Sequence, residues 1–429
     1  MAKGYREECF AASPAQALKP VAVFDSKRSI YHSALTPVQP TPTNSPSSPA
    51  ESSLHKRSAG TCDLRAQRRL SQFSNRKGTP LKIAQVAPLY ESVPPRLYGG
   101  TERVVSYLTE ELVQLGHEVT LFASGDSVTA AELIAVSPSA LRLNRECVDP
   151  YVYHTLLLEQ VFQRYEAYDV VHFHIDYLHF PISRRVQLNQ LTTLHGRLDI
   201  PDLVPLYREY AEMPLTSISH AQRKPLPWAN WVGNVYHGLP VDLFTPRADT
   251  GKYLAVVGRI SPEKRIDRAI RIALRAGMPL KIAAKVDKPD REYFTHVIEP
   301  MLREPSIEFL GEISQADKNE LLGNAYAMLF PIDWPEPFGR AMIESLACGT
   351  PVIAYPFGSV PEVVDEEKTG FVVHDENEAV EAVRKVENLS RATCRRVFEE
   401  RFSAERMGRE YLTVYSYLCE PESTSRMIS

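Results

Sequence analysis

Beyond its first eighty residues, the chain alternates short apolar runs with longer amphipathic stretches. The run LKIAQVAP at 81–88 predicts a buried strand, and TERVVSYLTEELVQLGH at 101–117 predicts an amphipathic helix, because its apolar side chains recur at helical spacing. EVTLFAS at 118–124 then predicts a second strand. The first unit is therefore β-α-β, as in a Rossmann-like domain, and Gly99 and Gly100 stand where the strand passes into the helix.

The same alternation continues through the rest of the chain. Further strands are expected in YDVVHFH at 168–174, QLTTLHG at 190–196, the start of YLAVVGRISPEKRIDRAIRIALRAGM at 253–278, PLKIAAKVD at 279–287 and IEFLGEIS at 307–314. The segment at 253–278 continues as a loop and a helix. Strands that alternate with helices in this way predict an α/β fold with parallel sheets.

The stretch WPEPFGRAMIESLACGTPVIAY at 334–355 carries the most chemical information. Its prolines keep the first residues out of a helix, and apolar residues spaced for a buried stripe then predict a helix at 340–348. Gly349 is placed to cap that helix, and a short buried strand follows it. Glu336 therefore precedes the helix and Glu344 lies on it, which places the two carboxylates near one crevice.

An ionised carboxylate accepts hydrogen bonds from two vicinal hydroxyls at once. One of these glutamates can therefore hold a ribose while the other meets a hexose, as in a nucleotide-sugar site. The residues alone leave a second interpretation open, because acidic side chains near the start of a helix also complement its dipole.

Two further features point to phosphate. Gly99 and Gly100 place backbone amides beside a helix N-terminus, where phosphate binds readily, although the full Gly-x-Gly-x-x-Gly spacing of a dinucleotide site is missing. Arg259 and Lys264 flank a loop and are spaced so that both cations can converge on a pyrophosphate. From the residues alone, the glycines could serve a tight turn and the cations a solvated surface.

Histidines stand at the carboxyl ends of two predicted strands. His172 and His174 share one face of their strand, because side chains alternate with period two. Such a pair could ligate a metal, but a third ligand is wanted, so a packed or hydrogen-bonded pair is favoured. His195 ends the next strand, and on its own it is typical of a structural histidine.

Length and composition agree with a globular protein of two domains. The chain has 429 residues, of which 44% are hydrophobic and 24% charged. No apolar run is long enough to cross a bilayer. The six cysteines contain no Cys-x-x-Cys pair, so neither a zinc site nor a disulfide framework is indicated, and a reducing cytoplasm is the simplest compartment.

Residues 1–79 differ from the rest of the chain. Stretches such as TPVQPTPTNSPSSPAESS predict a disordered tail, and its twelve Lys or Arg against five Asp or Glu give it a charge of +7, which leaves −11 on the remainder to reach the total of −4. Three interpretations stay open: peripheral contact with anionic lipid at the inner face of a membrane, nonspecific nucleic-acid contact, and a linker without function. No specific nucleic-acid partner is indicated, and the tail is expected to be dispensable for chemistry.

The Glu-Pro-Phe-Gly motif and its helix glutamate, followed by CGTPVIAYPFGSVPEVV and TGFVV, closely resemble the donor domain of family 4 glycosyltransferases. The resemblance extends from about residue 81 to about residue 416. That family consists of retaining enzymes with the GT-B fold, so the resemblance implies two Rossmann-like β/α/β domains that face a central cleft. It implies an acceptor domain at 80–246, a donor domain at 251–403, a helix at 404–417 that returns to the first domain, and a tail at 418–429.

The resemblance also assigns roles to the candidate donor-binding residues. Arg259 and Lys264 match the family's Arg-x4-Lys motif, which neutralises the leaving pyrophosphate, and Glu344 would hold the ribose hydroxyls. The pair Gly99–Gly100 would approach the donor phosphate and the reacting sugar. Arg265 stands where the family commonly has glycine, and its charge would lie near the phosphates or face solvent.

Two residues are candidates for the catalytic role. Glu336 would position the hexose together with the backbone around Phe338 and Gly339, and His195 would lie beside the transferred hexose, where an imidazole can bind a sugar hydroxyl. His174 would border the acceptor cleft, since ligands gather beyond the carboxyl ends of parallel strands.

The implied function is transfer of a hexose from a nucleoside-diphosphate sugar to an acceptor, with retention of anomeric configuration, in carbohydrate biosynthesis. No metal ion or other cofactor is expected, because cationic side chains neutralise the leaving group. The alternatives are a catalytically silent nucleotide-sugar-binding protein and a phosphorylase or epimerase on the same fold. The residues do not distinguish UDP, GDP and ADP donors, and they leave the acceptor open among a sugar, a lipid-linked glycan and a metabolite.

Overall fold

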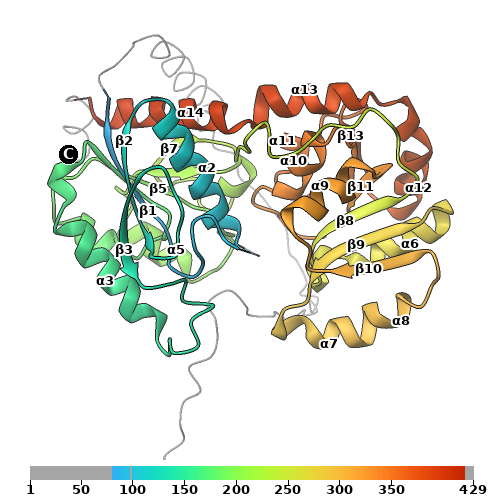
Figure 1. The fold of residues 1–429 in the computed structure, drawn as a ribbon, viewed down its shortest axis with the longest axis horizontal. Helices are drawn as coiled ribbons and strands as arrows, with labels where there is room; N and C mark the ends of the chain where they lie inside the picture. Colours follow the sequence, from blue (N-terminus) through green and yellow to red (C-terminus); the bar gives the residue numbers. More distant parts are fainter. Residues whose placement is uncertain (1–79, 97–98, 421–429) are drawn as a thin grey trace, which may run out of the picture. The chain divides into compact units, whose positions relative to one another are not determined.

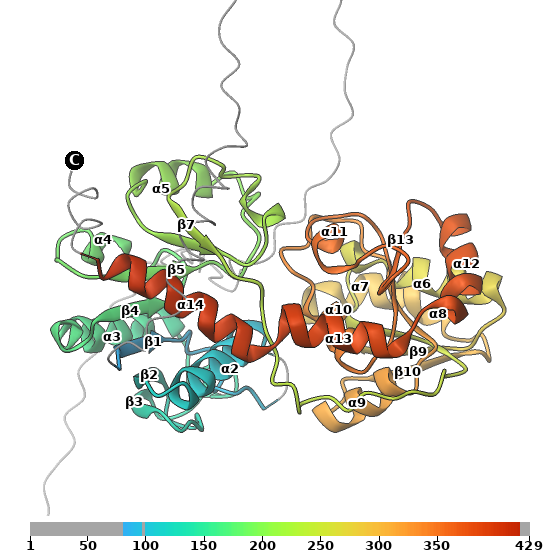
Figure 2. The same cartoon turned by 90° about the horizontal axis from the view of Figure 1, so that it is seen from above.

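The computed structural model describes residues 80–96 and 99–420. In these residues the chain forms two parallel β-sheets, each flanked by helices (Figures 1 and 2). The expectations for residues 1–79, including the disordered basic tail and its membrane contact, lie outside the described residues, as do those for 421–429.

The first sheet has seven strands in the order β3-β2-β1-β4-β5-β6-β7. The strands are β1 (Lys82–Val86), β2 (Glu118–Ser124), β3 (Glu132–Ser137), β4 (Val170–Phe173), β5 (Gln190–Thr193), β6 (Leu215–Ser217) and β7 (Trp231–Asn234). In the centre, Ile83 of β1 pairs with Val119 on one side and Val170 on the other. β1 is covered on both faces, which explains its continuous apolar run; Gln85 is its fully buried polar exception.

Helices α2 (Gly100–Gln114), α3 (Pro150–Phe162), α4 (Phe180–Ser183) and α5 (Leu203–Glu209) connect the strands of this sheet. The predicted β-α-β unit is confirmed as β1, α2 and β2. After α2, Gly116 adopts a φ of 90° and its N–H donates to the carbonyl of Val113, which ends the helix.

The sequence did not predict every element around this sheet. No strand or helix was expected between 125 and 167, but this segment contains β3 and α3. β3 is the edge strand and is only half buried, although its run LIAV at 133–136 is apolar. α3 begins at Pro150, and its N-cap Asp149 accepts a hydrogen bond from the N–H of Tyr151.

The second sheet has six strands in the order β10-β9-β8-β11-β12-β13. The strands are β8 (Leu254–Arg259), β9 (Leu280–Lys285), β10 (Ile307–Gly311), β11 (Ala327–Phe330), β12 (Val352–Ala354) and β13 (Gly370–Val372). Its helices are α6 (Ile266–Ala276), α7 (Arg291–Tyr293), α8 (Glu299–Met301), α9 (Gln315–Gly323), α10 (Arg340–Ala347), α11 (Val360–Val363), α12 (Glu376–Lys385) and α13 (Arg391–Phe402). The predicted helix at 340–348 is confirmed as α10, and Gly349 follows it with a φ of 78°.

The last helix, α14 (Ala404–Leu418), lies against the first sheet's α2 (Figure 2). Gly408 makes this packing close, because a Cβ at that position would lie 2.7 Å from Cγ of Glu111. The N-cap of α14 is Ser403, whose hydroxyl accepts from the N–H of Arg406 at 3.3 Å. The chain thus contributes a C-terminal helix to the sheet formed by its N-terminal part.

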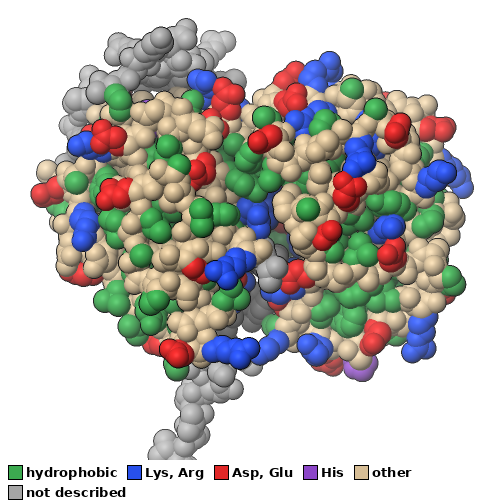
Figure 3. Space-filling view, viewed as in Figure 1, with side chains coloured by type: hydrophobic (Ala, Val, Ile, Leu, Met, Phe, Trp, Pro, Cys, Tyr) green, Lys and Arg blue, Asp and Glu red, His purple; other side chains and the backbone are tan. Residues whose placement is uncertain are grey.

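Each sheet reverses its strand order at one place, between β1 and β4 in the first and between β8 and β11 in the second. In parallel α/β sheets, ligands bind beyond the carboxyl ends of the strands at such a reversal. In the described part of the chain, no helix combines the length and apolar character that a membrane span requires. Acidic and basic side chains are interspersed over the face seen in Figure 3.

Candidate active site

The carboxyl ends of β8 and β11 carry the predicted donor residues. Arg259 is the last residue of β8, and Lys264 ends the short helix η3 (Pro262–Lys264) that follows. Glu336 lies in the loop after β11, and Glu344 lies in α10. Because β8 pairs directly with β11, the segments that carry these four residues meet at one edge of the sheet.

Lys264 and Glu336 contact each other directly. The ammonium of Lys264 forms an ion pair with Oε2 of Glu336, and Nε1 of Trp334 donates a hydrogen bond to the same oxygen at 2.9 Å. The ammonium also lies 5.0 Å from the centre of the Trp334 ring, within reach of a cation–π interaction. Both charged side chains are largely buried, at 16% and 13% exposed, so their pairing is only partly screened by solvent.

Three carboxylates surround the guanidinium of Arg259. Its nitrogens lie 3.1 Å from an oxygen of Glu263, 3.8 Å from one of Asp287 and 3.9 Å from one of Asp290. A diphosphate that binds to Arg259 therefore has to compete with carboxylates that already neutralise this cation.

Arg265 has a left-handed backbone, with φ 52° and ψ 47°. Glycine adopts this conformation without strain, whereas a residue with a side chain is strained there. Its guanidinium lies 3.1 Å from Asp267 and 2.6 Å from Asp333. Burial alone would raise the pKa of Asp267, but hydrogen bonds from Arg265 and Tyr293 outweigh it and lower that pKa to about 2. The charge of Arg265 is thus paired with two carboxylates.

The Glu-Pro-Phe-Gly loop is held by its own backbone and by the loop after β12. Gly339 has a φ of 74° and is the N-cap of α10. Gly358 packs against this loop so closely that a Cβ there would overlap the backbone of Glu336. The N–H of Ser359 donates to the carbonyl of Glu336 at 3.0 Å, and its hydroxyl donates to the carbonyl of Phe338 at 2.7 Å. These contacts fix the loop that presents Glu336.

Glu344 is buried between two cations. Its Oε1 lies 2.9 Å from the ammonium of Lys318, on α9, and 3.3 Å from the guanidinium of Arg340. Burial alone would raise the pKa of Glu344, but the charges of these two residues outweigh it, so the pKa lies below its ordinary value. The carboxylate is therefore ionised and can accept hydroxyl hydrogen bonds.

Gly99 and Gly100 lie at the N-terminus of α2, as expected. Gly99 is its N-cap, and a Cβ there would lie 2.7 Å from that of Pro95, so only glycine allows this close approach. The carbonyl of Gly100 accepts a hydrogen bond from Arg340 at 2.8 Å. Arg340 therefore connects the glycine pair at the start of α2 to Glu344 on α10, beside the second sheet.

The histidines of the first sheet hydrogen-bond to one another. Nδ1 of His174 lies 2.9 Å from Nε2 of His195, and Nδ1 of His195 lies 3.2 Å from Nε2 of His237. Both nitrogens of His172 are bonded elsewhere, to Tyr415 and Thr193. Among the described residues, no group of three or more His, Cys, Asp or Glu side chains is arranged to hold a metal.

The imidazole of His195 is thus fully bonded inside the protein. Burial and the nearby charge of Arg340 lower its pKa to about 3, so it is neutral at physiological pH. The structure brings His195 together with His174, and it places the predicted donor residues Arg259 and Lys264 at the edge of the other sheet.

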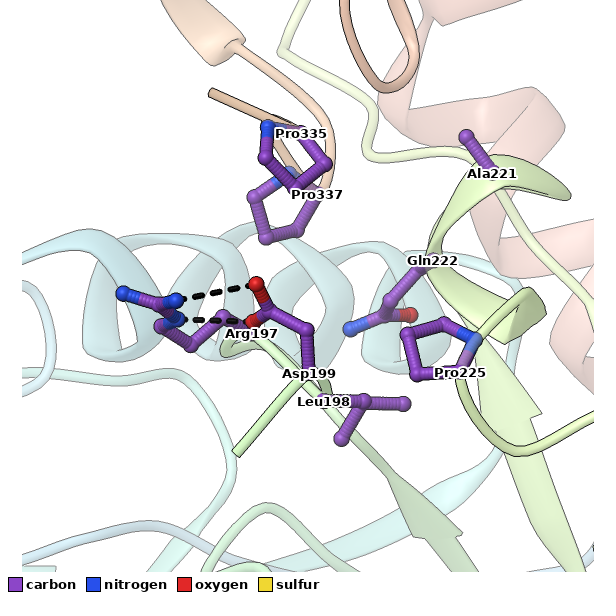
Figure 4. Close-up of a pocket in the computed structure, with 8 residues that line it drawn as sticks. All are labelled: Arg197, Leu198, Asp199, Ala221, Gln222, Pro225, Pro335 and Pro337. Atoms are coloured by element: carbon purple, nitrogen blue, oxygen red, sulfur yellow. Dashed lines mark hydrogen bonds and ion pairs between the residues drawn. The ribbon is translucent and has the colours of Figure 1, made fainter. Parts of the chain in front are cut away.

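A small pocket adjoins the Glu-Pro-Phe-Gly loop (Figure 4). It is lined by Arg197, Leu198, Asp199, Ala221, Gln222, Pro225, Pro335 and Pro337. Arg197 and Asp199 face each other across 2.7 and 2.9 Å hydrogen bonds in this pocket. Since Pro335 and Pro337 flank Glu336, the pocket borders the predicted hexose position.

Glu362, in α11, is a structural residue that the sequence did not single out. Its carboxylate accepts hydrogen bonds from the backbone N–H groups of His220 at 2.8 Å and Ala221 at 2.7 Å, and from the hydroxyl of Tyr236 at 3.0 Å. The hydroxyl of Ser219, the residue before His220, donates to the carbonyl of Pro337 at 2.6 Å. These bonds tie the segment after β6 to the loop that holds Glu336.

Sequence reasoning also overlooked Lys318, Arg340 and Trp334. Arg340 and Trp334 lie within the motif stretch, so their polar groups could have been considered as partners of the two glutamates. Lys318 carries no such signal, because a lysine on an amphipathic helix is usually solvated. Only the packing of α9 against α10 places it at Glu344.

Family comparisons agree with this architecture. Residues 98–235 match the model of Glycosyltransferase Family 4, and residues 244–401 match that of Glycosyl transferases group 1. The two-sheet fold is shared with AviGT4, a glycosyltransferase involved in Avilamycin A biosynthesis, with a TM-score of 0.60, 24% identity, and 79% of this chain and 98% of that chain covered. A structure of Alr3699/HepE from Anabaena in complex with UDP and glucose gives a TM-score of 0.60 at 15% identity, covering 79% and 100%.

The fold and the site thus define a glycosyltransferase with the GT-B fold, as the sequence predicted. The chain belongs to glycosyltransferase family 4. It is 26% identical over 367 residues to N-acetyl-alpha-D-glucosaminyl L-malate synthase of Bacillus anthracis, covering 74% of this chain and 93% of that protein. It is 29% identical over 193 residues to a probable sucrose-phosphate synthase of Thermosipho melanesiensis, covering 41% of this chain and only 45% of that protein.

Proposed function

We propose that this enzyme transfers a hexose from a nucleoside-diphosphate sugar with retention of anomeric configuration and without a metal ion. The observation that carries the proposal is the direct pairing of Lys264 with Glu336 at the end of β8, next to Arg259. A cation suited to the leaving diphosphate and a carboxylate suited to the hexose are thus in direct contact. In a nucleoside-diphosphate sugar the diphosphate is bonded to the hexose, so such a donor can bind both side chains at once.

The cations would stabilise the leaving group. Negative charge develops on the diphosphate as its bond to the anomeric carbon breaks, and Arg259 and Lys264, which end β8 and the helix η3 after it, would bind it. Each would exchange a carboxylate partner for a phosphate oxygen. A divalent cation is unnecessary where two protein cations perform this neutralisation.

The carboxylates would bind the sugars of the donor. Glu344 is ionised and accepts hydrogen bonds, so it suits the two hydroxyls of a ribose. Glu336 would hold the hexose, together with the backbone of Phe338 and Gly339 at the start of α10. The Gly99–Gly100 pair would admit the phosphate to the N-terminus of α2.

Retention would follow from attack on the same face that the diphosphate leaves, with a donor phosphate oxygen taking the proton of the acceptor hydroxyl. Glu336 is not assigned as a covalent nucleophile. One of its oxygens already binds both Lys264 and Trp334, which lowers its nucleophilicity and suits a positioning contact. Analysis of the product's anomeric proton by NMR, against the donor's, tests retention directly.

Release of free nucleoside diphosphate from a panel of UDP-, GDP- and ADP-sugars tests the function. One donor is expected to be turned over, and Lys264→Met is expected to lower kcat about 100-fold or more, because one charged group at the leaving diphosphate is lost. Lys385→Met, at the exposed end of α12, is the matched control. Equal activity in Lys264→Met and wild type would show that the diphosphate binds elsewhere, and tight donor binding without any release would indicate a binding protein.

A further inference from the structure

A continuous chain of hydrogen bonds crosses the carboxyl ends of β1, β4 and β5. Nε2 of Gln85 donates to the hydroxyl of Tyr415 at 3.0 Å, and Oε1 of Gln85 lies 2.8 Å from Nε2 of His174. His174 continues to His195 at 2.9 Å, and His195 to His237 at 3.2 Å. Five side chains from segments far apart in the sequence thus form one connected hydrogen-bond network.

The amide of Gln85 gives this chain a direction. With its amide nitrogen facing Tyr415 and its amide oxygen facing His174, Gln85 accepts from Nε2 of His174, which in this arrangement carries the proton. A neutral His174 then has a lone pair on Nδ1, which must accept from Nε2 of His195. By the same reasoning, Nδ1 of His195 accepts from Nε2 of His237. One amide therefore fixes the tautomer of three imidazoles in succession.

The other side of Gln85 obeys the same direction. The hydroxyl of Tyr415 accepts from Gln85 and can donate to Nδ1 of His172 at 2.7 Å. Nε2 of His172 then donates to the hydroxyl of Thr193 at 2.7 Å. In this arrangement every N–H or O–H donor of the hydrogen-bond network from Thr193 to His237 faces an acceptor, so the direction set by Gln85 is consistent throughout the network.

The surroundings keep the imidazoles neutral. His172, His174, His195 and His237 are buried, and burial is the main cause that lowers the pKa of each. The nearby charges are positive and act in the same direction: Arg340 from α10 on His195 and His237, and Arg406 from α14 on His237. The hydroxyls of Tyr411 and Tyr415 from α14 stay protonated, because burial raises the pKa of both.

This series of hydrogen bonds ends at His237, beside the candidate active site. Nδ1 of His237 is buried and has no hydrogen-bond partner among the described residues. The ring of His237 packs edge-on against Phe338 of the Glu-Pro-Phe-Gly loop, with 4.8 Å between ring centres. Because Nε2 of His237 carries the proton, this open nitrogen can only accept a hydrogen bond, so it suits a hydroxyl group and not a phosphate or carboxylate oxygen.

We propose that Gln85, His174 and His237 are positioning residues that hold His195 neutral with its proton on Nε2, and that Nδ1 of His237 accepts a hydrogen bond from a substrate hydroxyl. The inference rests on the proposed sugar-transfer function for its second part only. Its first part concerns the resting protein and can be measured without turnover. A fixed, uncharged imidazole beside the hexose adds no positive charge that would compete with Lys264 and Arg259 for the leaving diphosphate.

NMR of the full chain labelled with ¹⁵N-histidine tests the tautomers, with signals assigned by single His→Gln variants. His174, His195 and His237 are expected to carry their proton on Nε2 from about pH 6 to about pH 8, the range in which an ordinary histidine changes its charge. A proton on Nδ1 of His195, or an imidazolium signal from it at neutral pH, would overturn the assignment. The tautomers are read from the wild-type protein, and the variants serve only to assign its signals.

Gln85→Glu tests the control exerted by the amide. A buried carboxylate beside His174 favours the imidazolium, so His174 is expected to become charged near neutral pH and kcat to fall about tenfold or more, with a new pH dependence. Gln163→Glu, at the exposed C-cap of α3, introduces the same charge away from this hydrogen-bond network and is expected to change neither the tautomers nor kcat. Unchanged tautomers and kcat in Gln85→Glu would contradict the proposal.

His237→Leu tests the open end. It removes the acceptor nitrogen, so KM for one of the sugar substrates is expected to rise about tenfold with a smaller effect on kcat. An unchanged KM would refute the hydroxyl contact. If wild type turns over no donor while the three tautomers are as expected, the proposed function fails and the assignment of His195 stands.

Discussion

The ammonium of Lys264 and the carboxylate of Glu336, 72 positions apart in the chain, form an ion pair, and the indole N–H of Trp334 donates a hydrogen bond to the same carboxylate. The two residues come from the loops after β8 and β11, which are neighbours at the reversal of strand order. In the protein without donor, the carboxylate serves as the counter-ion of the lysine. Donor binding would replace it with a phosphate.

Glu336→Gln separates the two roles of this pair. The substitution removes the counter-ion of Lys264, so affinity for the free nucleoside diphosphate is expected to increase severalfold, by about 1 kcal/mol. It also weakens the contact to the hexose, so kcat is expected to fall about 100-fold. Calorimetric titration with the diphosphate and steady-state release assays measure the two effects, and weaker binding of the diphosphate would contradict this account.

Glu263→Gln is expected to strengthen binding without a loss of kcat. Glu263 pairs with Arg259 at 3.1 Å, and its removal leaves the guanidinium with only the more distant Asp287 and Asp290. KM for the donor should therefore fall severalfold. Glu292→Gln, on the exposed side of α7, is the control, and an equal change in both variants would mean that overall charge, not Arg259, is responsible.

The buried pair of Lys318 and Glu344 is expected to make Glu344→Ala strongly destabilising. The substitution leaves Lys318 buried without its carboxylate partner, which costs about 3 kcal/mol or more in the free energy of unfolding. The double variant Lys318→Met with Glu344→Leu removes both charges and is expected to recover most of that loss. Urea denaturation of wild type, Lys318→Met, Glu344→Leu and the double variant gives the coupling free energy, and additive effects would show that the two side chains do not interact.

The same carboxylate predicts a pH dependence of stability. The pKa of Glu344 is lower in the folded protein than its ordinary value of 4.5, so its stabilising contribution is present above about pH 4.5 and is lost as the pH falls through the folded pKa. The difference in unfolding free energy between wild type and Glu344→Gln is expected to shrink on acidification from pH 7 to about pH 4. A difference that stays constant would mean that Glu344 is not ionised in the folded state.

Arg265 offers a test of backbone conformation that is independent of activity. Its left-handed φ of 52° favours glycine, so Arg265→Gly is expected to be more stable than Arg265→Ala by about 1 kcal/mol, although both lose the pairs with Asp267 and Asp333. At Arg275, inside α6, the order is expected to reverse, because glycine is unfavourable in a right-handed helix. Thermal unfolding of the four variants checks both signs.

Local sequence determined the elements whose signals are local. The apolar run of β1, the helical spacing of α2 and the cap glycine Gly349 each act within a few residues, and the structure has the strand, the helix and the end of α10 where they were expected. The Glu-Pro-Phe-Gly loop was placed for the same reason, since its prolines and glycine restrict their own backbone. β3 was missed although it contains the apolar run LIAV at 133–136, because periodicity alone does not assign so short a run to a strand.

Only the tertiary structure decided which side chains meet. The sequence gives no spacing rule for Lys318 at Glu344 or Lys264 at Glu336, because these contacts depend on which strands and helices lie side by side. The same holds for the hydrogen bonds of Gln85 to His174 and Tyr415. They depend on the pairing of β1 with β4 and on the packing of α14 beside them. Periodicity and turn residues determine elements through short-range sterics, whereas charge pairing and tautomer direction follow from the packing of distant elements.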